Sequence, residues 1–529
     1  RLYLYLNLTK PSRQLYLSYA RMGNDGKSIR PAYLVGTLKR LFPDLETEHP
    51  AQAPVLSQVV TPREGMRYLA QGLRDYVEGV MERSEGQVGG EPGSREFFSL
   101  YAAYAGREEE REMVDLLHRA AFLHYRESGL SRAVARALYG LQLENSVSRL
   151  ETYAACAYRH FLQYGLTLRE REEFGFENVD MGNAFHQVLD AFAGRLTESG
   201  YTWFDFPEEW GDQAVEEAME QFAAEYGGSV LYASARSAYG IRRMARILKR
   251  TVRALQRQLQ KGSFVPDAHE LSFHMADRLE AVNIALSEQE KMRLTGRIDR
   301  VDISESEDRV YVKIIDYKSG DRRFDLAALY YGLQLQLVVY MNAAMEMEAR
   351  RHPDKEIVPA AMLYYHVTDP MVESQVELSP QEINEQILEQ LRMNGVVCGE
   401  EDIIQRLDRE MGDKSTVIPV EKKKDGSYSA RSSVMSSQEL GLVSAYVSHK
   451  VRQIGQEILG GHKEVNPYEK GSNEACTYCA YKKVCGFDPG IPGYRRRLLK
   501  ELDRQEAFES MEEELGDEHR IYAGSTEGH

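Results

Sequence analysis

One stretch in the second half of the chain constrains the fold more than any other: LTGRIDRVDISESEDRVYVKIIDYKSG, at residues 294–320. Residues 294–303 and 310–317 are rich in Ile, Val and Tyr, which favour strands, and residues 304–309 between them are polar. Two such runs separated by a short polar turn predict an antiparallel hairpin. A sheet built around this hairpin then fixes where its charged residues point.

The hairpin carries three charged residues that the predicted pairing brings together. A turn centred near Glu307 and Asp308 places Asp299 opposite Asp316, and side-chain alternation puts Asp316 and Lys318 on one face. Two adjacent carboxylates repel each other, so such pairs usually hold a hard cation, for which Mg²⁺ is the default. A neighbouring lysine could stabilise charge on a phosphate or help to generate hydroxide. The alternative is a surface hairpin with three solvated charges, because D-x-K alone is a short motif.

The two halves of the hairpin, GRIDRVD and IIDYKSG, resemble motifs of the RecB-like branch of PD-(D/E)xK nucleases. That branch adds a histidine on an upstream helix and a Q-x-x-x-Y on a downstream helix. The resemblance implies an α/β nuclease domain with a central mixed sheet flanked by helices. The matching residues are Asp316 and Lys318 for the D-x-K, Asp299 for the preceding acid, His186 in GNAFH for the histidine, and Gln336 and Tyr340.

The resemblance also implies a role for each of these residues. His186 would be a metal ligand, although a lone histidine on an amphipathic helix is more often a core or surface residue. Gln336 and Tyr340 would contact the DNA backbone or orient Lys318, and packing of their helix on the sheet is the alternative. The residues implied to hold Mg²⁺ are His186, Asp299, Asp316 and, through its carbonyl, Tyr317.

Four of the five cysteines form a one-plus-three pattern. Cys476, Cys479 and Cys485 give C-x2-C-x5-C near the end of the chain, Cys156 lies far upstream, and Cys398 stands outside the pattern. Five cysteines are too few for a disulfide framework, and thiolates hold both zinc and iron–sulfur clusters, so the spacing leaves both open. The pattern resembles the four-iron (4Fe-4S) cluster site of AddB-type nucleases. That resemblance implies a cluster that staples the start of the nuclease domain to its end.

Residues 1–145 open with the strand-like run RLYLYLNLT and continue with polar helical stretches from about residue 63. The segment contains no GxxxxGK[ST] phosphate-binding loop, so ATP hydrolysis is not assigned to it. LYLNLTKPSRQLYLSYA and GKSIRPAYLV resemble the last motif region of UvrD-like helicases as it occurs in AddB proteins. Where active helicases place an arginine finger in T-R-A, this chain has Thr9, Lys10 and Pro11, so we expect an inactive helicase remnant.

The remaining elements are predicted from local pattern. We expect a turn at 23–26, a loop at 86–94, strands within 264–286 and at 360–366, helices at 326–349 and 437–460, and an exposed polar hairpin or loop within 396–440. Glu270 lies where RecB-like nucleases often carry an acid, but an ordinary edge-strand glutamate is the favoured interpretation. The expected domains are the helicase-like segment 1–145, the nuclease domain 146–493 and a charged tail 494–529, helical in part. Residues Arg242, Arg246, Lys249, Arg253 and Arg257 form a helical stripe that is either a DNA contact or a solvated face.

A net charge of −16 argues against a protein that coats nucleic acid non-specifically, so local patches must carry any DNA contact. No run of 18 apolar residues and no signal peptide is visible, and we expect a cytoplasmic protein that looks like part of a longer one. The overall resemblance, to the C-terminal part of AddB (RexB-like) subunits, implies an Mg²⁺-dependent exonuclease that cuts the 5′-terminated strand at DNA ends with an AddA helicase–nuclease partner. The alternatives are a free-standing RecB-like exonuclease of the CRISPR-adaptation type and a non-catalytic DNA-end-binding scaffold.

Overall fold

The computed structural model describes residues 2–21, 28–47, 59–84, 94–126, 128–171, 178–225, 235–273, 279–374 and 377–525. The turn expected at 23–26 and all but the last residue of the loop expected at 86–94 lie outside these ranges. The chain forms two compact units, which divide between Leu123 and His124. The three functional domains expected from the sequence stay a prediction.

The first unit is helical. Its small core holds apolar side chains of α4, α5 and α6, and the Tyr104 hydroxyl donates to the Pro62 carbonyl at 2.6 Å. The strand expected at its start is wrong, because Leu2–Thr9 is a helix without buried side chains. A helix satisfies its backbone hydrogen bonds locally, whereas a strand needs a neighbour to pair with. The elements of this unit are α1 (Leu2–Thr9), α2 (Tyr33–Leu41), α4 (Pro62–Ser84), α5 (Arg95–Ala105), η2 (Glu108–Glu110) and α6 (Arg111–Ala121).

A mixed six-stranded sheet lies at the centre of the second unit, with strand order β2-β5-β6-β7-β8-β9. The predicted hairpin is its middle, since β5 and β6 pair antiparallel, and the strand expected at 360–366 extends it as β7, parallel to β6. A parallel neighbour needs a crossover connection, which the helices between β6 and β7 provide. The strands are β2 (Val265–Ser272), β5 (Arg297–Glu305), β6 (Arg309–Lys318), β7 (Glu356–His366), β8 (Asn394–Cys398) and β9 (Val434–Met435).

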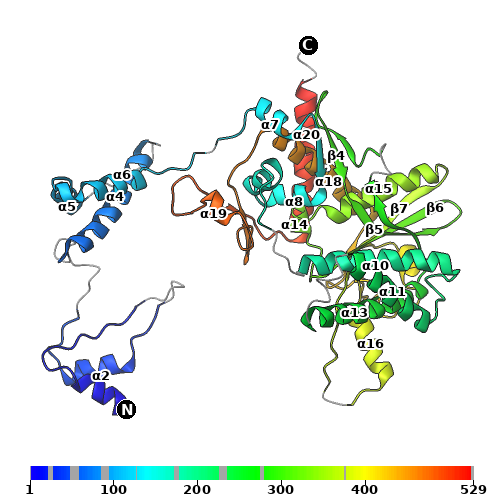
Figure 1. The fold of residues 1–529 in the computed structure, drawn as a ribbon, viewed down its shortest axis with the longest axis horizontal. Coiled ribbons are helices and arrows are strands. Elements are labelled where there is room, and N and C mark those ends of the chain that lie inside the picture. The colour runs from blue at the N-terminus through cyan, green and yellow to red at the C-terminus, as the bar shows by residue number, and fades with distance from the viewer. Residues whose placement is uncertain are drawn as a thin grey trace. The chain divides into compact units, whose positions relative to one another are not determined.

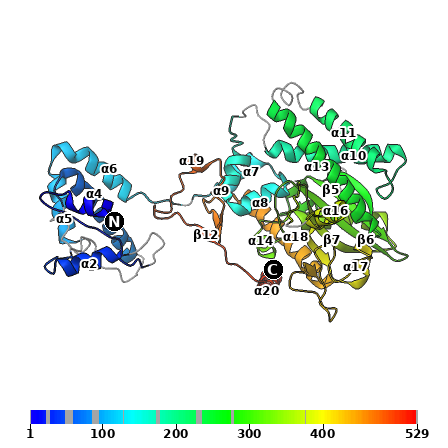
Figure 2. The same ribbon diagram turned by 90° about the horizontal axis from the view of Figure 1, so that it is seen from below.

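Helices cover both faces of this sheet, which is what the buried strands require. Eight of the ten residues of β6 are buried, so neither face of that strand can meet water. Figures 1 and 2 show α10 (Asn178–Ser199), α11 (Glu208–Glu225) and α13 (Ala235–Gln260) grouped on one side of the sheet. On the other side lie α15 (Gln336–Arg351) and α18 (Ser437–Gly460), the latter covering the predicted helix at 437–460.

Three predicted elements are broken or differently placed. The first strand of the hairpin is interrupted at Gly296, because residues upstream of it belong to a separate three-stranded sheet, β1-β4-β3. The helix expected at 326–349 divides into α14 (Leu326–Tyr330) and α15, and Gly332 between them has a positive φ of 77° that ends the first helix. The region 396–440 is not only an exposed loop, since it contains part of β8 and helix α17 with buried Ile403 and Ile404.

The remaining elements of the second unit complete the frame around the sheet. They are α7 (Arg132–Tyr139), β1 (Gln142–Ser146), α8 (Val147–Ala155), α9 (Ala157–His160), η3 (Phe161–Gly165), β3 (Asn283–Ala285), β4 (Lys291–Thr295), α14 (Leu326–Tyr330), α16 (Pro380–Gln390), α17 (Glu401–Leu407), β10 (Tyr468–Lys470), β11 (Asn473–Glu474), α19 (Lys482–Cys485), β12 (Arg497–Leu498) and α20 (Arg504–Ser525).

Candidate active site

The hairpin brings the two predicted carboxylates together. Arg300 pairs with Ile315, so the next pair in the same register sets Asp299 opposite Asp316. Both side chains are buried, Asp299 with 8% and Asp316 with 1% of its surface exposed. The Tyr317 backbone N–H donates to Asp299 Oδ2 at 2.7 Å, which fixes that carboxylate against β6.

Asp316 is a buried carboxylate with little to compensate it. Its main counter-charge is Lys318, whose Nζ lies 2.5 Å from Oδ2 in an ion pair of poor hydrogen-bond geometry. Burial and the nearby Asp299 outweigh this ammonium and raise the pKa of Asp316 to about 6. A buried charge in this state is costly unless a cation approaches it, so these oxygens fit a divalent metal.

A histidine and a second acid lie beside Asp299. His186 Nδ1 is 3.3 Å from Asp299 Oδ1 and 3.6 Å from Glu270 Oε1, and one potential ligand atom from each of the three lies within 4.8 Å of the others. Burial alone would lower the pKa of His186, but the two carboxylates raise it to about 10. His186 therefore sits in an anionic pocket whose ligand types suit a divalent cation.

Glu270, for which the sequence favoured an ordinary edge-strand role, lies beside His186 in the structure. It lies opposite Asp299, between the pairs His269 with Arg300 and Leu271 with Ile298. Its φ of 44° falls in the left-handed region, which is unusual for a non-glycine residue inside a strand. Strained backbone of this kind persists at sites where it directs a side chain. The alternation of residues along a strand does not predict such a distortion. The only indication in the sequence was that RecB-like nucleases often carry an acid at the position of Glu270.

Lys318, the predicted catalytic lysine, is held from the following helix. Lys318 Nζ donates to Gln336 Oε1 at 3.2 Å, and Gln336 Nε2 donates to the Tyr340 hydroxyl at 2.9 Å. Tyr340 is buried and its ring packs edge-on against Phe273. The two predicted roles for Q-x-x-x-Y, orienting Lys318 and packing on the sheet, are thus both compatible with this geometry.

A buried ionic cluster that sequence analysis missed supports the hairpin from its other face. Arg300 and Asp302 are completely buried, with Arg300 Nε 2.6 Å from Asp302 Oδ1, and Lys313 Nζ lies 2.7 Å from Asp302 Oδ2. Burial alone would raise the pKa of Asp302, but the two cations lower it to about 2. Arg300 also lies over the Trp203 ring, 5.0 Å from its centroid. The sequence did contain a signal for this cluster: in GRIDRVD, Arg300 and Asp302 occupy alternate positions of a strand and therefore share one face.

The four cysteines of the one-plus-three pattern line a single cavity, and all are free thiols. Cys156 forms the C-cap of α8 and is buried, which raises the pKa of its thiol, whereas Cys398 is buried in β8 outside this cavity. Four thiols around one cavity can hold either zinc or an iron–sulfur cluster, so this geometry leaves both open.

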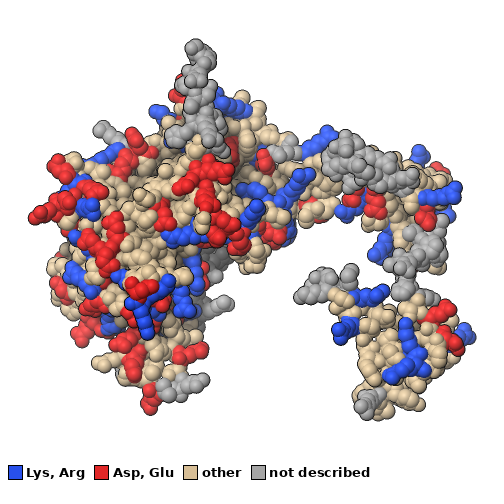
Figure 3. Space-filling view, turned by 180° about the vertical axis from the view of Figure 1, so that it is seen from behind, with Lys and Arg blue, Asp and Glu red and all other residues tan. Residues whose placement is uncertain are grey.

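The basic stripe is a helix face, on α13, but much of it is paired. Arg246 bonds to Asp369, Lys249 to Glu216, and Arg253 to Asp212. In the view of Figure 3, basic and acidic side chains are interspersed over the second unit. These ion pairs weaken the interpretation of the stripe as a DNA contact, since the cations already have partners.

Comparisons with known proteins agree with this geometry. The family model described as the PD-(D/E)XK nuclease superfamily matches residues 144–486. The chain is 40% identical over 541 residues to a protein of Lachnoclostridium phytofermentans that is named as a subunit of an ATP-dependent helicase/deoxyribonuclease, covering 99% of this chain. It is 32% identical to proteins of the same name from Alkaliphilus oremlandii and Clostridium acetobutylicum, over 97% and 98% of this chain. The chain spans 44% of the length of each of these relatives.

None of the helices in the described segments is long and apolar enough to cross a membrane.

Proposed function

Because the chain belongs to the PD-(D/E)XK nuclease superfamily, we propose that it hydrolyses phosphodiester bonds of DNA in a reaction that requires Mg²⁺. The observation that carries this proposal is the buried Asp316 carboxylate, which is paired with Lys318 and lies opposite Asp299, itself beside His186 and Glu270. A carboxylate whose burial and acidic neighbour outweigh its one ammonium is better explained by a bound cation than by a structural ion pair, in which the charges offset each other. This observation disfavours the non-catalytic alternative.

Each residue of the site has a proposed task. His186, Asp299, Asp316 and the Tyr317 carbonyl hold the metal, and Glu270 joins them because its carboxylate lies beside His186. When bound, Mg²⁺ supplies a Lewis acid and lowers the pKa of water. Lys318 stabilises the charge that develops on the phosphate, and Gln336 keeps its ammonium aimed at the site.

The cysteine cavity is proposed to hold a four-iron cluster. Its support is the convergence of four free thiols on one cavity, in a one-plus-three pattern that resembles the cluster site of AddB-type nucleases. Cys156 follows α8, and the other three lie between β11 and the residues that follow α19, so a bound cluster ties together segments far apart in the sequence. A cross-link over so long a loop is worth roughly 4–5 kcal/mol as an upper estimate.

The biological setting follows from the relatives. We propose that the chain is part of an AddB-type subunit that works in the cytoplasm with an AddA-like helicase–nuclease, degrading the 5′-terminated strand at double-strand breaks for recombinational repair. The support is similarity over 97–99% of the chain to proteins named as subunits of an ATP-dependent helicase/deoxyribonuclease. That coverage includes the helical first unit, which disfavours a free-standing exonuclease of the CRISPR-adaptation type.

Metal-dependent cleavage of single-stranded DNA by the full chain tests the nuclease proposal. Lys318→Ala should abolish cleavage while the chain still folds and binds DNA, because Lys318 is not part of the core. Some loss of thermal stability is expected, since the variant leaves buried Asp316 without its ammonium. Arg323→Ala is a matched control, since Arg323 lies on the loop after β6 and is mostly exposed. Wild-type-like cleavage by the lysine variant would contradict the assigned mechanism.

A further inference from the structure

The helix that carries Gln336 begins without a cap of its own. Leu335, at the N-cap position of α15, offers no side-chain oxygen to the first backbone N–H groups. Those groups are normally satisfied by a neighbouring Ser, Thr, Asp or Asn. Here the acceptor is remote: Glu151 Oε1 accepts from the Leu335 N–H at 2.9 Å and from the Gln336 N–H at 3.2 Å.

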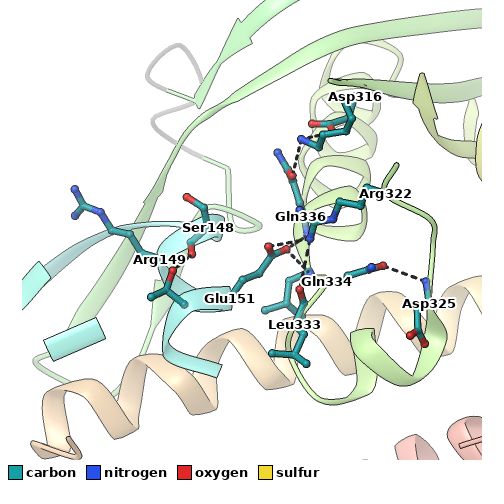
Figure 4. Close-up of polar contacts among 12 residues, drawn as sticks. Ser148, Arg149, Glu151, Asp316, Arg322, Asp325, Leu333, Gln334 and Gln336 are labelled. Atoms are coloured by element: carbon teal, nitrogen blue, oxygen red, sulfur yellow. Dashed lines mark hydrogen bonds and ion pairs between the residues drawn. The ribbon is translucent and has the colours of Figure 1, made fainter. Parts of the chain in front are cut away.

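Glu151 also fixes the segment that follows the catalytic lysine. Its other oxygen, Oε2, accepts from Arg322 Nη2 at 3.0 Å, and the Arg322 carbonyl in turn accepts from Asn394 Nδ2 at 3.0 Å. Figure 4 shows Glu151 reaching from α8 to a point between Arg322 and the start of α15. The Glu151 side chain is only 14% exposed, so its three bonds are sheltered from water.

Gln336 connects Glu151 to Lys318. Gln336 is held by its backbone to Glu151, and its side chain accepts from Lys318 Nζ and donates to Tyr340. We propose that Glu151 is a positioning residue for the nuclease reaction: it anchors the start of α15, so that Gln336 keeps the Lys318 ammonium aligned beside Asp316. This inference rests on the proposed nuclease function and deepens it.

The same residue links the active site to the cysteine cavity. Glu151 lies on α8, and that helix ends at Cys156, its C-cap. The Cys156 segment is fixed further by Asn466, whose side chain accepts from the Ala157 N–H at 3.0 Å. We therefore expect a loss of order at the end of α8 to reach the carboxylate that anchors α15, and so to affect the position of Lys318.

Single-turnover cleavage of a labelled single-stranded oligonucleotide by the full chain tests the first step. Glu151→Ala should lower the rate at saturating DNA by about 10- to 100-fold, the usual effect of a small misplacement, with unchanged DNA affinity in EDTA. Glu151→Gln should stay within about 3-fold, because its amide oxygen can still accept both N–H groups. Glu346→Ala is the matched control, since Glu346 also accepts two backbone N–H groups and pairs with an arginine, but these bonds lie far along α15 from Gln336.

A double-mutant cycle separates positioning from general destabilisation. If Glu151 acts through Gln336, Glu151→Ala should add no further loss of rate in a Gln336→Ala background. Hydrogen exchange gives a readout that needs no activity: the amides of 335 and 336 should exchange faster in Glu151→Ala and in Cys156→Ala, but not in Glu346→Ala. Multiplicative rate losses in the double variant, or amides that stay protected in Glu151→Ala, would overturn the proposal. If the wild-type chain fails to cleave DNA with Mg²⁺, the proposed function fails, while the exchange experiment still decides the anchoring.

Discussion

Replacing Asp316 by asparagine should abolish cleavage and, in the absence of metal, stabilise the protein. The pKa of Asp316 is raised from its ordinary 3.8 to about 6, because the carboxylate is buried and faces Asp299. At about 1.36 kcal/mol per pKa unit, a difference of about 2 corresponds to about 3 kcal/mol of destabilisation when the group is charged. Asparagine has nearly the same shape as aspartate but carries no charge. The unfolding free energy of the Asp316→Asn variant should therefore exceed that of the wild type.

The pH dependence gives the sign of the effect. Because the pKa of Asp316 is raised in the folded state, protonation of Asp316 stabilises the folded wild type. That stabilisation is fully present below pH 4 and is lost as the pH rises through about 6. The gain of Asp316→Asn should therefore be largest at pH 7 to 8 and should fade as the pH drops toward 4. Denaturant unfolding in EDTA, followed by tryptophan fluorescence at several pH values, measures it.

Asp299 provides the matched control for this experiment. It is buried on the same hairpin, but its oxygens accept the Tyr317 N–H and face His186. Asp299→Asn disturbs those contacts and should give no gain in stability. An Asp316→Asn variant that is no more stable than wild type at pH 8 in EDTA, or whose gain does not fade at low pH, would refute the reasoning about a strained metal-binding carboxylate.

Three further predictions follow from the site. Cys156→Ala should lower the iron content and the melting temperature, because one lost ligand opens the staple, whereas Cys398→Ala should leave iron unchanged; about one zinc and no iron in anaerobically purified protein would contradict the cluster. Arg300→Met should cost about 3–5 kcal/mol by unfolding titration, because Asp302 then keeps only Lys313 as a counter-charge in a fully buried position. Glu270→Gln should raise the Mg²⁺ concentration for half-maximal cleavage about 10-fold, and an unchanged metal dependence would exclude Glu270 from the metal site.

The local geometry of the site could be predicted from the sequence because it depends on short-range periodicity. Alternation along a strand puts Asp316 and Lys318 on one face, and the length of the turn sets Asp299 opposite Asp316. Four residues make about one helical turn, so Gln336 and Tyr340 necessarily lie side by side. Each of these relations spans few bonds, and the backbone leaves them little freedom.

Other features depend on which distant segments meet, and only the tertiary structure decides that. Glu270 joins His186 because a local distortion of β2 turns it toward the site, and Glu151 anchors α15 from 184 residues away. The apolar run at 2–9 alternates like a strand, yet with no paired neighbour among the described residues it forms a helix. A sequence pattern indicates which side chains of a segment can be buried or can form hydrogen bonds. It does not indicate which distant residue will be the partner. The packing of helices on the central sheet brings that partner into place, through contacts that no local pattern encodes.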